Sequence, residues 1–250
     1  VIHGNTLLRR RPSKRSIPCP HRTGDKRIML ENKSALIFDF DGTLVDSMGV
    51  WVEIDKEYIE KYQLTEPENF HKDMEGLSYT ETAEYFLKVF PSLPHTVEEL
   101  KEEWYHMALY KYSHEIQLKK GAEAFLRKAK EEGLKTGIAT SNDRQLVEAC
   151  LASLGISEVI DTISTGCEVK KGKPAPDVYL KAAENLSVKP ENCLVFEDVP
   201  MGILAGKNAG MQVCAVEDWF SAPQQEKKRK LADYYIQDYN EILDHTFEVL

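Results

Sequence analysis

The chain has 250 residues, of which 42% are hydrophobic and 29% charged, a balance typical of a soluble globular protein with one large domain or one domain with an insert. No apolar run approaches the roughly 18 residues needed to span a bilayer, and a formal net charge of −9 argues against a general nucleic-acid binder. The five cysteines form no CxxC pair, which argues against disulfides and a zinc knuckle and indicates a reducing, cytoplasmic compartment. We expect a monomer.

Residues 1–28 differ in composition from the rest of the chain. They hold eight lysines and arginines, three prolines and one acidic residue. Because the segment offers few apolar side chains to bury, we expect a disordered tail outside the fold. The alternatives are a transit peptide, translated upstream sequence with Met29 as the natural start, and a basic arm for nucleic acid.

Apolar runs and helical periodicity alternate from residue 35 onward. Continuous apolar runs predict strands that are buried on both faces, over 35–38, 136–139, around 159–160, 193–196 and 213–216. Apolar residues at helical spacing predict helices over 121–132, 143–154 and 176–186. This alternation indicates an α/β fold with a doubly wound parallel sheet.

The segment 48–116 interrupts the alternation. It contains no clear strand run, and its apolar residues recur at helical spacing, as at Val50, Ile54 and Tyr58. We therefore expect an all-helical insert over 48–116 within an α/β core made of 29–47 and 117–250.

The strongest chemical signal directly follows the first predicted strand. Asp39 and Asp41 leave the carboxyl end of that strand, and Gly42 permits a tight turn. Ligands of open α/β sheets bind at this edge. An Asx-rich turn is the structural alternative, but such a turn does not need two aspartates after an apolar strand.

A second polar group, Thr140, Ser141 and Asn142, follows the strand predicted over 136–139. Hydroxyl and N–H groups at this place can hold phosphate oxygens at a helix N-terminus. The same residue types are ordinary helix caps, so the group is a weak signal when taken alone.

Two further groups carry charge. Lys173 lies in a loop that Pro174 and Pro176 stiffen, although a single loop lysine is usually solvated. Glu197 and Asp198 end the strand predicted over 193–196. Because burying two carboxylates is costly without a cation, this pair predicts a Mg²⁺ site with oxygen ligands.

These four groups, in this order, resemble the four motifs of the haloacid dehalogenase superfamily, and the resemblance extends from residue 34 to about residue 243. The most similar subgroup is the β-phosphoglucomutase-like phosphatases, whose small helical cap the insert resembles. The resemblance implies a Mg²⁺-dependent phosphatase that acts on a small phosphate ester of the sugar or nucleoside monophosphate type through an aspartyl-phosphate. Neither nucleic acid nor membrane is expected as a partner, because of the net charge and the lack of a long apolar run.

The resemblance also assigns roles to residues. Asp39 would be the nucleophile and Asp41 the general acid and base. Mg²⁺ would be held by Asp39, the Asp41 backbone carbonyl, Asp198 and, with help from water, Glu197. The implied phosphate-binding residues are Thr140, Ser141, Asn142 and Lys173.

The insert supplies candidate substrate contacts. In β-phosphoglucomutase a histidine, a lysine and an arginine stand where this chain has Trp51, Glu75 and Tyr79. Because a mutase needs cations to hold a second phosphate, these replacements favour a phosphatase, with a sugar-phosphate mutase as the nearest alternative. A non-catalytic binding protein is disfavoured because all four motifs are intact.

Overall fold

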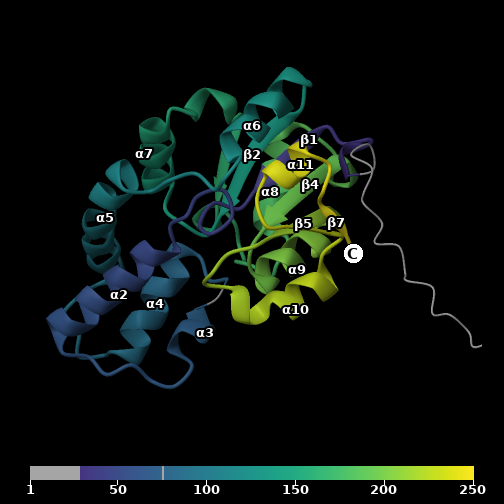
Figure 1. Cartoon of the computed structure of the whole chain (residues 1–250). Coiled ribbons are helices and arrows are strands. Elements are labelled where there is room, and N and C mark those ends of the chain that lie inside the picture. The colour runs from purple at the N-terminus through teal and green to yellow at the C-terminus, as the bar shows by residue number, and fades with distance from the viewer. Residues whose placement is uncertain (1–28, 75) are drawn as a thin grey trace, which may run out of the picture.

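The computed structural model describes residues 29–74 and 76–250, and its centre is a seven-stranded sheet in the order β3-β2-β1-β4-β5-β6-β7 (Figure 1). Neighbouring strands are parallel except β6 and β7, which pair antiparallel. The predictions for segment 1–28 and for Glu75 lie outside the described residues. The strands are β1 (Ala35–Phe38), β2 (Lys135–Thr140), β3 (Thr162–Thr165), β4 (Cys193–Glu197), β5 (Gln212–Val216), β6 (Tyr234–Ile236) and β7 (Glu248–Val249).

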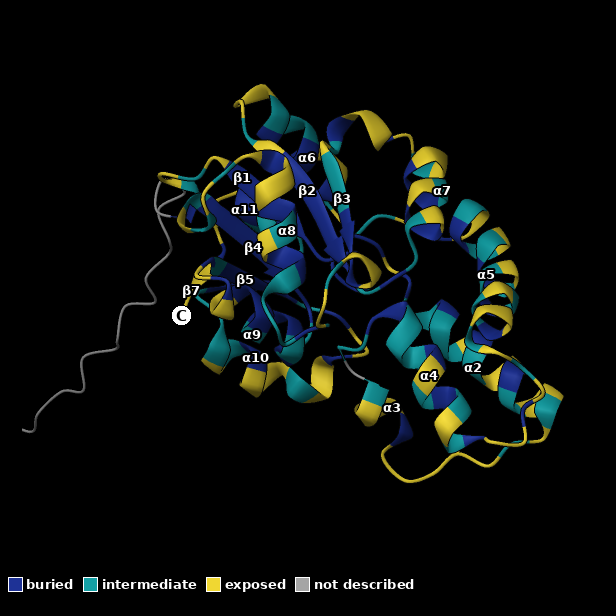
Figure 2. Cartoon of the chain, turned by 180° about the vertical axis from the view of Figure 1, so that it is seen from behind, coloured by how far each residue is buried: buried dark blue, intermediate teal, exposed yellow. Residues whose placement is uncertain are grey.

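Helices cover both faces of this sheet, which explains why the central strands are apolar throughout. In β1, Leu36 and Phe38 belong to one hydrophobic cluster, while Ala35 and Ile37 belong to a second cluster on the opposite face. Figure 2 shows the central strands buried between helices whose outer faces are exposed. One face packs against α6 (Ala122–Glu131), α7 (Arg144–Leu154) and α11 (Asn240–Leu243), and the other against α8 (Asp177–Leu186) and α9 (Pro200–Asn208).

The prediction of a mostly parallel, doubly wound sheet is confirmed, with one misplaced strand and two missed ones. Residues Ser157–Val159 form a short 3₁₀ helix, and strand β3 begins only at Thr162. Val159 is apolar because it is buried in the core, and β3 is an edge strand with few apolar residues. Strands β6 and β7 were not predicted because three and two residues are too short to show a period.

A helical cap lies beside the sheet. It consists of α2 (Met48–Tyr62), α3 (Phe70–Met74), α4 (Tyr79–Val89) and α5 (Val97–His114), while α10 (Gln225–Leu231) belongs to the core. Capping boxes begin α4, at Ser78, and α5, at Thr96. Figure 1 shows α2, α3 and α4 set apart from the sheet. The boundaries predicted for the insert stay a prediction.

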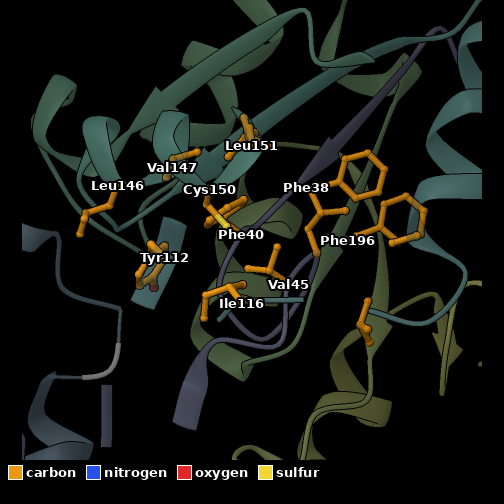
Figure 3. Packing of buried hydrophobic residues seen from close by; sticks show 14 of the residues in the cluster. Phe38, Phe40, Val45, Tyr112, Ile116, Leu146, Val147, Cys150, Leu151 and Phe196 are labelled. Atoms are coloured by element: carbon orange, nitrogen blue, oxygen red, sulfur yellow. The ribbon is translucent and has the colours of Figure 1, made fainter. Parts of the chain in front are cut away.

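Helix α5 connects the cap to the core, because it packs along α7. Close to its C-terminal end, the ring of Tyr112 stacks on Phe40, with the ring centroids 6.5 Å apart (Figure 3). This packing brings a cap side chain to the loop that follows β1. No described helix has both the length and the apolarity that crossing a bilayer requires.

Candidate active site

The four predicted polar groups meet at the carboxyl edge of the sheet. Strands β1, β2 and β4 are adjacent and parallel, so the residues that follow them converge. A cavity of about 670 Å³ opens there, between the core and the cap. Its lining includes the predicted residues Asp39, Asp41, Ser141, Asn142, Lys173, Glu197 and Asp198, and also Trp51 and Tyr79 from the cap.

Lys173 lies at the floor of the cavity and bridges two carboxylates. Its Nζ lies 2.6 Å from Asp39 Oδ1 and 2.6 Å from Glu197 Oε1, and all three side chains are buried. Burial raises the pKa of Asp39 to about 7, although the Lys173 charge opposes this shift. Burial would lower the pKa of Lys173, but the two carboxylates outweigh it and raise that pKa. The loop lysine is therefore a fixed cation inside the site.

Asp198 lies beside this bridge, and one of its carboxylate oxygens accepts no hydrogen bond from the described residues. Its Oδ1 accepts a hydrogen bond from Thr43 Oγ1 at 2.8 Å, whereas the buried Oδ2 has no hydrogen-bond partner among the described residues. Burial, and then repulsion from Glu197 and Asp39, raises the pKa of Asp198 well above its usual value. Such an arrangement of buried carboxylates is unfavourable unless a cation joins them.

The donor set fits a divalent cation such as Mg²⁺. One oxygen from each of Asp39, Glu197 and Asp198 lies within 4.8 Å of the others. Glu197 already accepts hydrogen bonds from Lys173 and Tyr179 at Oε1 and from the Val199 N–H at Oε2. Asp39 and Asp198 therefore have more freedom to bind a cation directly, and hard oxygen ligands are those that Mg²⁺ prefers.

Glycine keeps the first loop close to this carboxylate. Gly42 has a φ of +75°, and a Cβ at this position would lie 2.6 Å from Asp198 Oδ2. A side chain here would meet both a strained backbone and the proposed metal ligand.

Three hydrogen-bond donors hold the carboxylate of Asp41. Ser47 Oγ lies 2.5 Å and Asn142 Nδ2 2.8 Å from it, and the hydroxyl of Tyr112 donates to Oδ1. Trp51 Nε1 in turn donates to the Tyr112 hydroxyl at 2.7 Å. Burial raises the pKa of Asp41, and these donors oppose the rise. The side chain of Asn142, predicted to bind phosphate, is thus directed to Asp41.

Beside Asn142, the end of β2 and the loop after it contain Thr140 and Ser141, whose oxygens accept hydrogen bonds from backbone N–H groups. The hydroxyl of Thr140 accepts a hydrogen bond from the Asn142 N–H at 3.0 Å, and Thr140 is not among the cavity-lining residues. Ser141 lines the cavity, and its carbonyl oxygen accepts from the Tyr79 N–H at 2.8 Å. The Tyr79 hydroxyl donates to the Lys101 carbonyl, so this hydroxyl is used within the cap.

Sequence reasoning missed several lining or supporting residues. Lys72 on α3 and Lys227 on α10 are exposed cations on the cavity wall, and Ser47 and Tyr112 hold Asp41. No local motif marks Lys72, Lys227 or Tyr112. Ser47 alone could have been noted, because it directly follows the first motif.

Comparison with known proteins places the chain in one family of hydrolases. A model of the family described as haloacid dehalogenase-like hydrolase matches residues 36–216. The chain is 32% identical over 216 residues to the bifunctional riboflavin kinase/FMN phosphatase of Arabidopsis thaliana, an alignment covering 86% of this chain and 55% of that protein. The chain therefore spans about half the length of that relative.

Two bacterial phosphatases are also similar. The validoxylamine A 7′-phosphate phosphatase of Streptomyces hygroscopicus subsp. limoneus is 30% identical, with 70% of this chain and 81% of that protein aligned. The phosphorylated carbohydrates phosphatase of Thermotoga maritima is 29% identical, with 71% and 82% aligned.

Solved structures share the fold. CbbY from Rhodobacter sphaeroides, in complex with phosphate, superposes with a TM-score of 0.74 at 22% identity, covering 86% of this chain and 99% of that chain. The β-phosphoglucomutase of Clostridium difficile gives 0.69 at 24% identity, covering 86% and 97%. At this level of identity the two structures show the α/β core with its helical cap and no more.

Proposed function

Because this chain belongs to the haloacid dehalogenase-like hydrolase family, we propose that it is a phosphatase that hydrolyses a small phosphorylated metabolite by way of a phosphoryl group on Asp39. The observation that carries the proposal is the buried bridge from Lys173 to Asp39 and Glu197, beside the unpartnered oxygen of Asp198. Phosphoryl transfer requires a nucleophile, a fixed positive charge and an oxygen ligand for a metal ion, and these groups lie together at one edge of the sheet.

In the first step, a carboxylate oxygen of Asp39 forms a bond to phosphorus and the ester P–O bond breaks. Asp41 donates a proton to the departing oxygen, so the leaving group departs as an alcohol. In the second step, Asp41 takes a proton from water while the water oxygen bonds to phosphorus. The bond from phosphorus to Asp39 then breaks, which restores both aspartates and releases inorganic phosphate.

Several groups would hold the phosphoryl oxygens during both steps. Lys173 provides positive charge on the cavity floor, and the backbone N–H of Ser141 lies at the N-terminal approach to α7. The hydroxyl of Thr140 stabilises this loop through its bond to Asn142. A Mg²⁺ ion bound by Asp39, Asp198 and the Asp41 carbonyl, with Glu197 assisting, would offset repulsion between carboxylates and phosphate.

The substrates named for the relatives support a small-molecule ester. They are FMN, a phosphorylated carbohydrate and validoxylamine A 7′-phosphate, all of which release phosphate from a modest organic group. The cavity volume of about 670 Å³ suits a ligand of this size. The monomeric state and the cytoplasmic location stay predictions.

A sugar-phosphate mutase is the alternative that the cavity keeps open, since Lys72 and Lys227 are available to hold a second phosphate. Phosphate release from a panel of phosphomonoesters, with and without Mg²⁺, tests the proposal. Glucose 1-phosphate with a bisphosphate primer, followed by NMR, separates the two functions. A phosphatase gives free phosphate first, and a mutase gives the 6-phosphate first.

A further inference from the structure

Beyond the phosphoryl-binding floor, the cavity continues into the cap, where its wall is mostly apolar. This upper wall contains the side chains of Met48, Trp51, Ile54, Leu77, Tyr79 and Trp104. A sugar phosphate presents hydroxyl groups in most directions, and such a wall would leave many of them without hydrogen-bond partners. The wall fits a leaving group with a large apolar surface.

The aromatic side chains in this wall form a contiguous set. The ring centroids of Trp51 and Tyr79 lie 6.2 Å apart, and those of Tyr79 and Trp104 lie 6.0 Å apart. Both pairs meet edge to face, so each ring is fixed by its neighbour. Tyr79 and Trp104 are 6% and 4% exposed, so they support the wall from the cap core, and the partly exposed ring of Trp51 is the one on which a flat aromatic ligand can stack.

Charged groups interrupt the apolar wall, and outside the phosphoryl-binding floor Asp55 on α2 is the carboxylate among them, beside the cations Lys72 and Lys227. Asp55 lies one helical turn beyond Trp51 on α2 and also lines the cavity. Its side chain is 20% exposed, and its Oδ2 is 3.5 Å from Nδ1 of His71, which is too long for a good hydrogen bond. A carboxylate in such a place has acceptor capacity for a ligand N–H or O–H.

Helix α2 also sets the distance between Asp55 and the reaction centre. The helix begins next to Ser47, which donates to Asp41, and Asp55 is eight residues further along the chain. At a rise of about 1.5 Å per residue, Asp55 lies roughly 12 Å along the axis from Ser47. This span matches a phosphate joined to a ring through a short sugar-like linker.

We propose, on the basis of the phosphatase function above, that the substrate is the phosphomonoester of a planar nitrogen heterocycle carried on a short polyol or ribose. The ring binds against Trp51, which Tyr79 and Trp104 support from the cap core, and a ring N–H donates a hydrogen bond to Asp55. The linker spans from there to the phosphate over Asp39.

The test compares two probes, one with a heterocyclic base at C1′ of the ribose and one with a hydroxyl there. Uridine 5′-monophosphate and ribose 5-phosphate carry the same phosphate on the same sugar. The proposal expects kcat/KM to be at least about tenfold higher for uridine 5′-monophosphate, mostly through a lower KM, because burial of the ring adds apolar contact. Equal efficiency, or a preference for ribose 5-phosphate, would overturn it.

A pair of variants tests Asp55 directly. Asp55→Leu removes the acceptor and should reduce the ratio of the two kcat/KM values by about tenfold. Glu57→Leu is the matched control, since Glu57 is exposed on the same helix and does not line this cavity; it should leave the ratio unchanged. An unchanged ratio in Asp55→Leu would contradict the assigned hydrogen bond.

Tryptophan fluorescence separates failure of this proposal from failure of the phosphatase function. Trp51 and Trp104 line the cavity, and Trp219→Phe removes an exposed tryptophan whose side chain is outside it. In that variant, saturable quenching by uridine 5′-monophosphate, and much weaker quenching by ribose 5-phosphate, supports the ring site even if neither probe is hydrolysed. Hydrolysis of both probes without ring-dependent quenching refutes the ring site alone.

Discussion

Tyr112, on the last helix of the cap, donates a hydrogen bond from its hydroxyl to Oδ1 of Asp41, in the loop after the first strand of the core. The same hydroxyl accepts from Trp51 Nε1 at 2.7 Å and lies 3.0 Å from Asn142 Nδ2. The proposed general acid and base is therefore positioned by side chains from α2, α5 and the loop after β2. Proton transfer at Asp41 and the placement of the cap are physically connected.

Loss of the Tyr112 hydroxyl should impair turnover more than stability. Tyr112→Phe keeps the ring packed on Phe40 but removes one donor to Asp41, and we expect kcat to fall about tenfold with little change in KM. Tyr110→Phe, on the same helix, is the control because Tyr110 is 63% exposed. Steady-state kinetics on both variants decides; equal kcat values would remove Tyr112 from the positioning of Asp41.

Neutralising Asp198 should stabilise the metal-free protein and abolish its response to metal. Asp198→Asn retains the acceptor for Thr43 but removes a buried charge that lies near Asp39 and Glu197. We expect a higher melting temperature without Mg²⁺ and little further rise when Mg²⁺ is added. Asp244→Asn, on an exposed residue, should behave like the unsubstituted chain. A normal Mg²⁺-dependent rise in Asp198→Asn would contradict the proposed ligand set.

The close approach of Gly202 to Glu197 predicts a sensitive position. A Cβ at Gly202 would overlap the Glu197 carboxylate, so Gly202→Ala should displace Glu197 and destabilise the fold by roughly 1–3 kcal/mol. Gly49→Ala is the matched control, since a Cβ there meets nothing within 4 Å, and alanine in a helix gains up to about 1 kcal/mol. Chemical denaturation measures both variants. Equal stabilities would mean that Glu197 moves aside without loss.

The partly buried carboxyl of Asp55 makes stability depend on pH. Burial raises its pKa from 3.8 to about 6, with His71 lowering and Glu66 raising it further. Because the folded state holds the proton more tightly, this group favours folding most below pH 4, and the benefit is lost as pH rises through 6. Asp55→Asn should therefore raise the unfolding free energy at pH 7.5 by roughly 1–3 kcal/mol, and by less at pH 5. Urea denaturation at both pH values would show an equal gain if this reasoning fails.

The sequence predicted the α/β fold and the convergence of the polar groups for one physical reason. Parallel strands place their carboxyl ends at one edge, so residues that follow apolar runs, such as Asp39, Thr140 and Asp198, come together whatever the rest of the fold does. Local patterns also placed the core helices α6, α7 and α8 within a residue or two. They failed at β3, where Val159 is apolar for packing in the core and the edge strand itself is mostly polar.

Contacts between distant segments were not predictable in this way. Tyr112 resembles an ordinary cap residue at helical spacing, and its bond to Asp41 depends on how α5 packs on α7. Lys72 and Lys227 reach the cavity from α3 and α10, which are far apart in sequence. Comparison with the corresponding positions of β-phosphoglucomutase correctly identified Trp51 and Tyr79 as residues that line the cavity. It did not show that the Tyr79 hydroxyl bonds to the Lys101 carbonyl within the cap.

The most direct test of the account is capture of the phosphoryl group on Asp39. The chain is mixed with Mg²⁺ and a ³²P-labelled phosphomonoester that it hydrolyses, quenched in acid within one turnover, and digested for mass spectrometry. The account predicts a base-labile phosphate on the peptide containing Asp39, and neither label nor turnover in Asp39→Asn, because loss of the nucleophile lowers kcat by several orders of magnitude. Release of phosphate by Asp39→Asn at more than about a hundredth of the normal rate, with no label on the unsubstituted protein, would contradict the covalent mechanism.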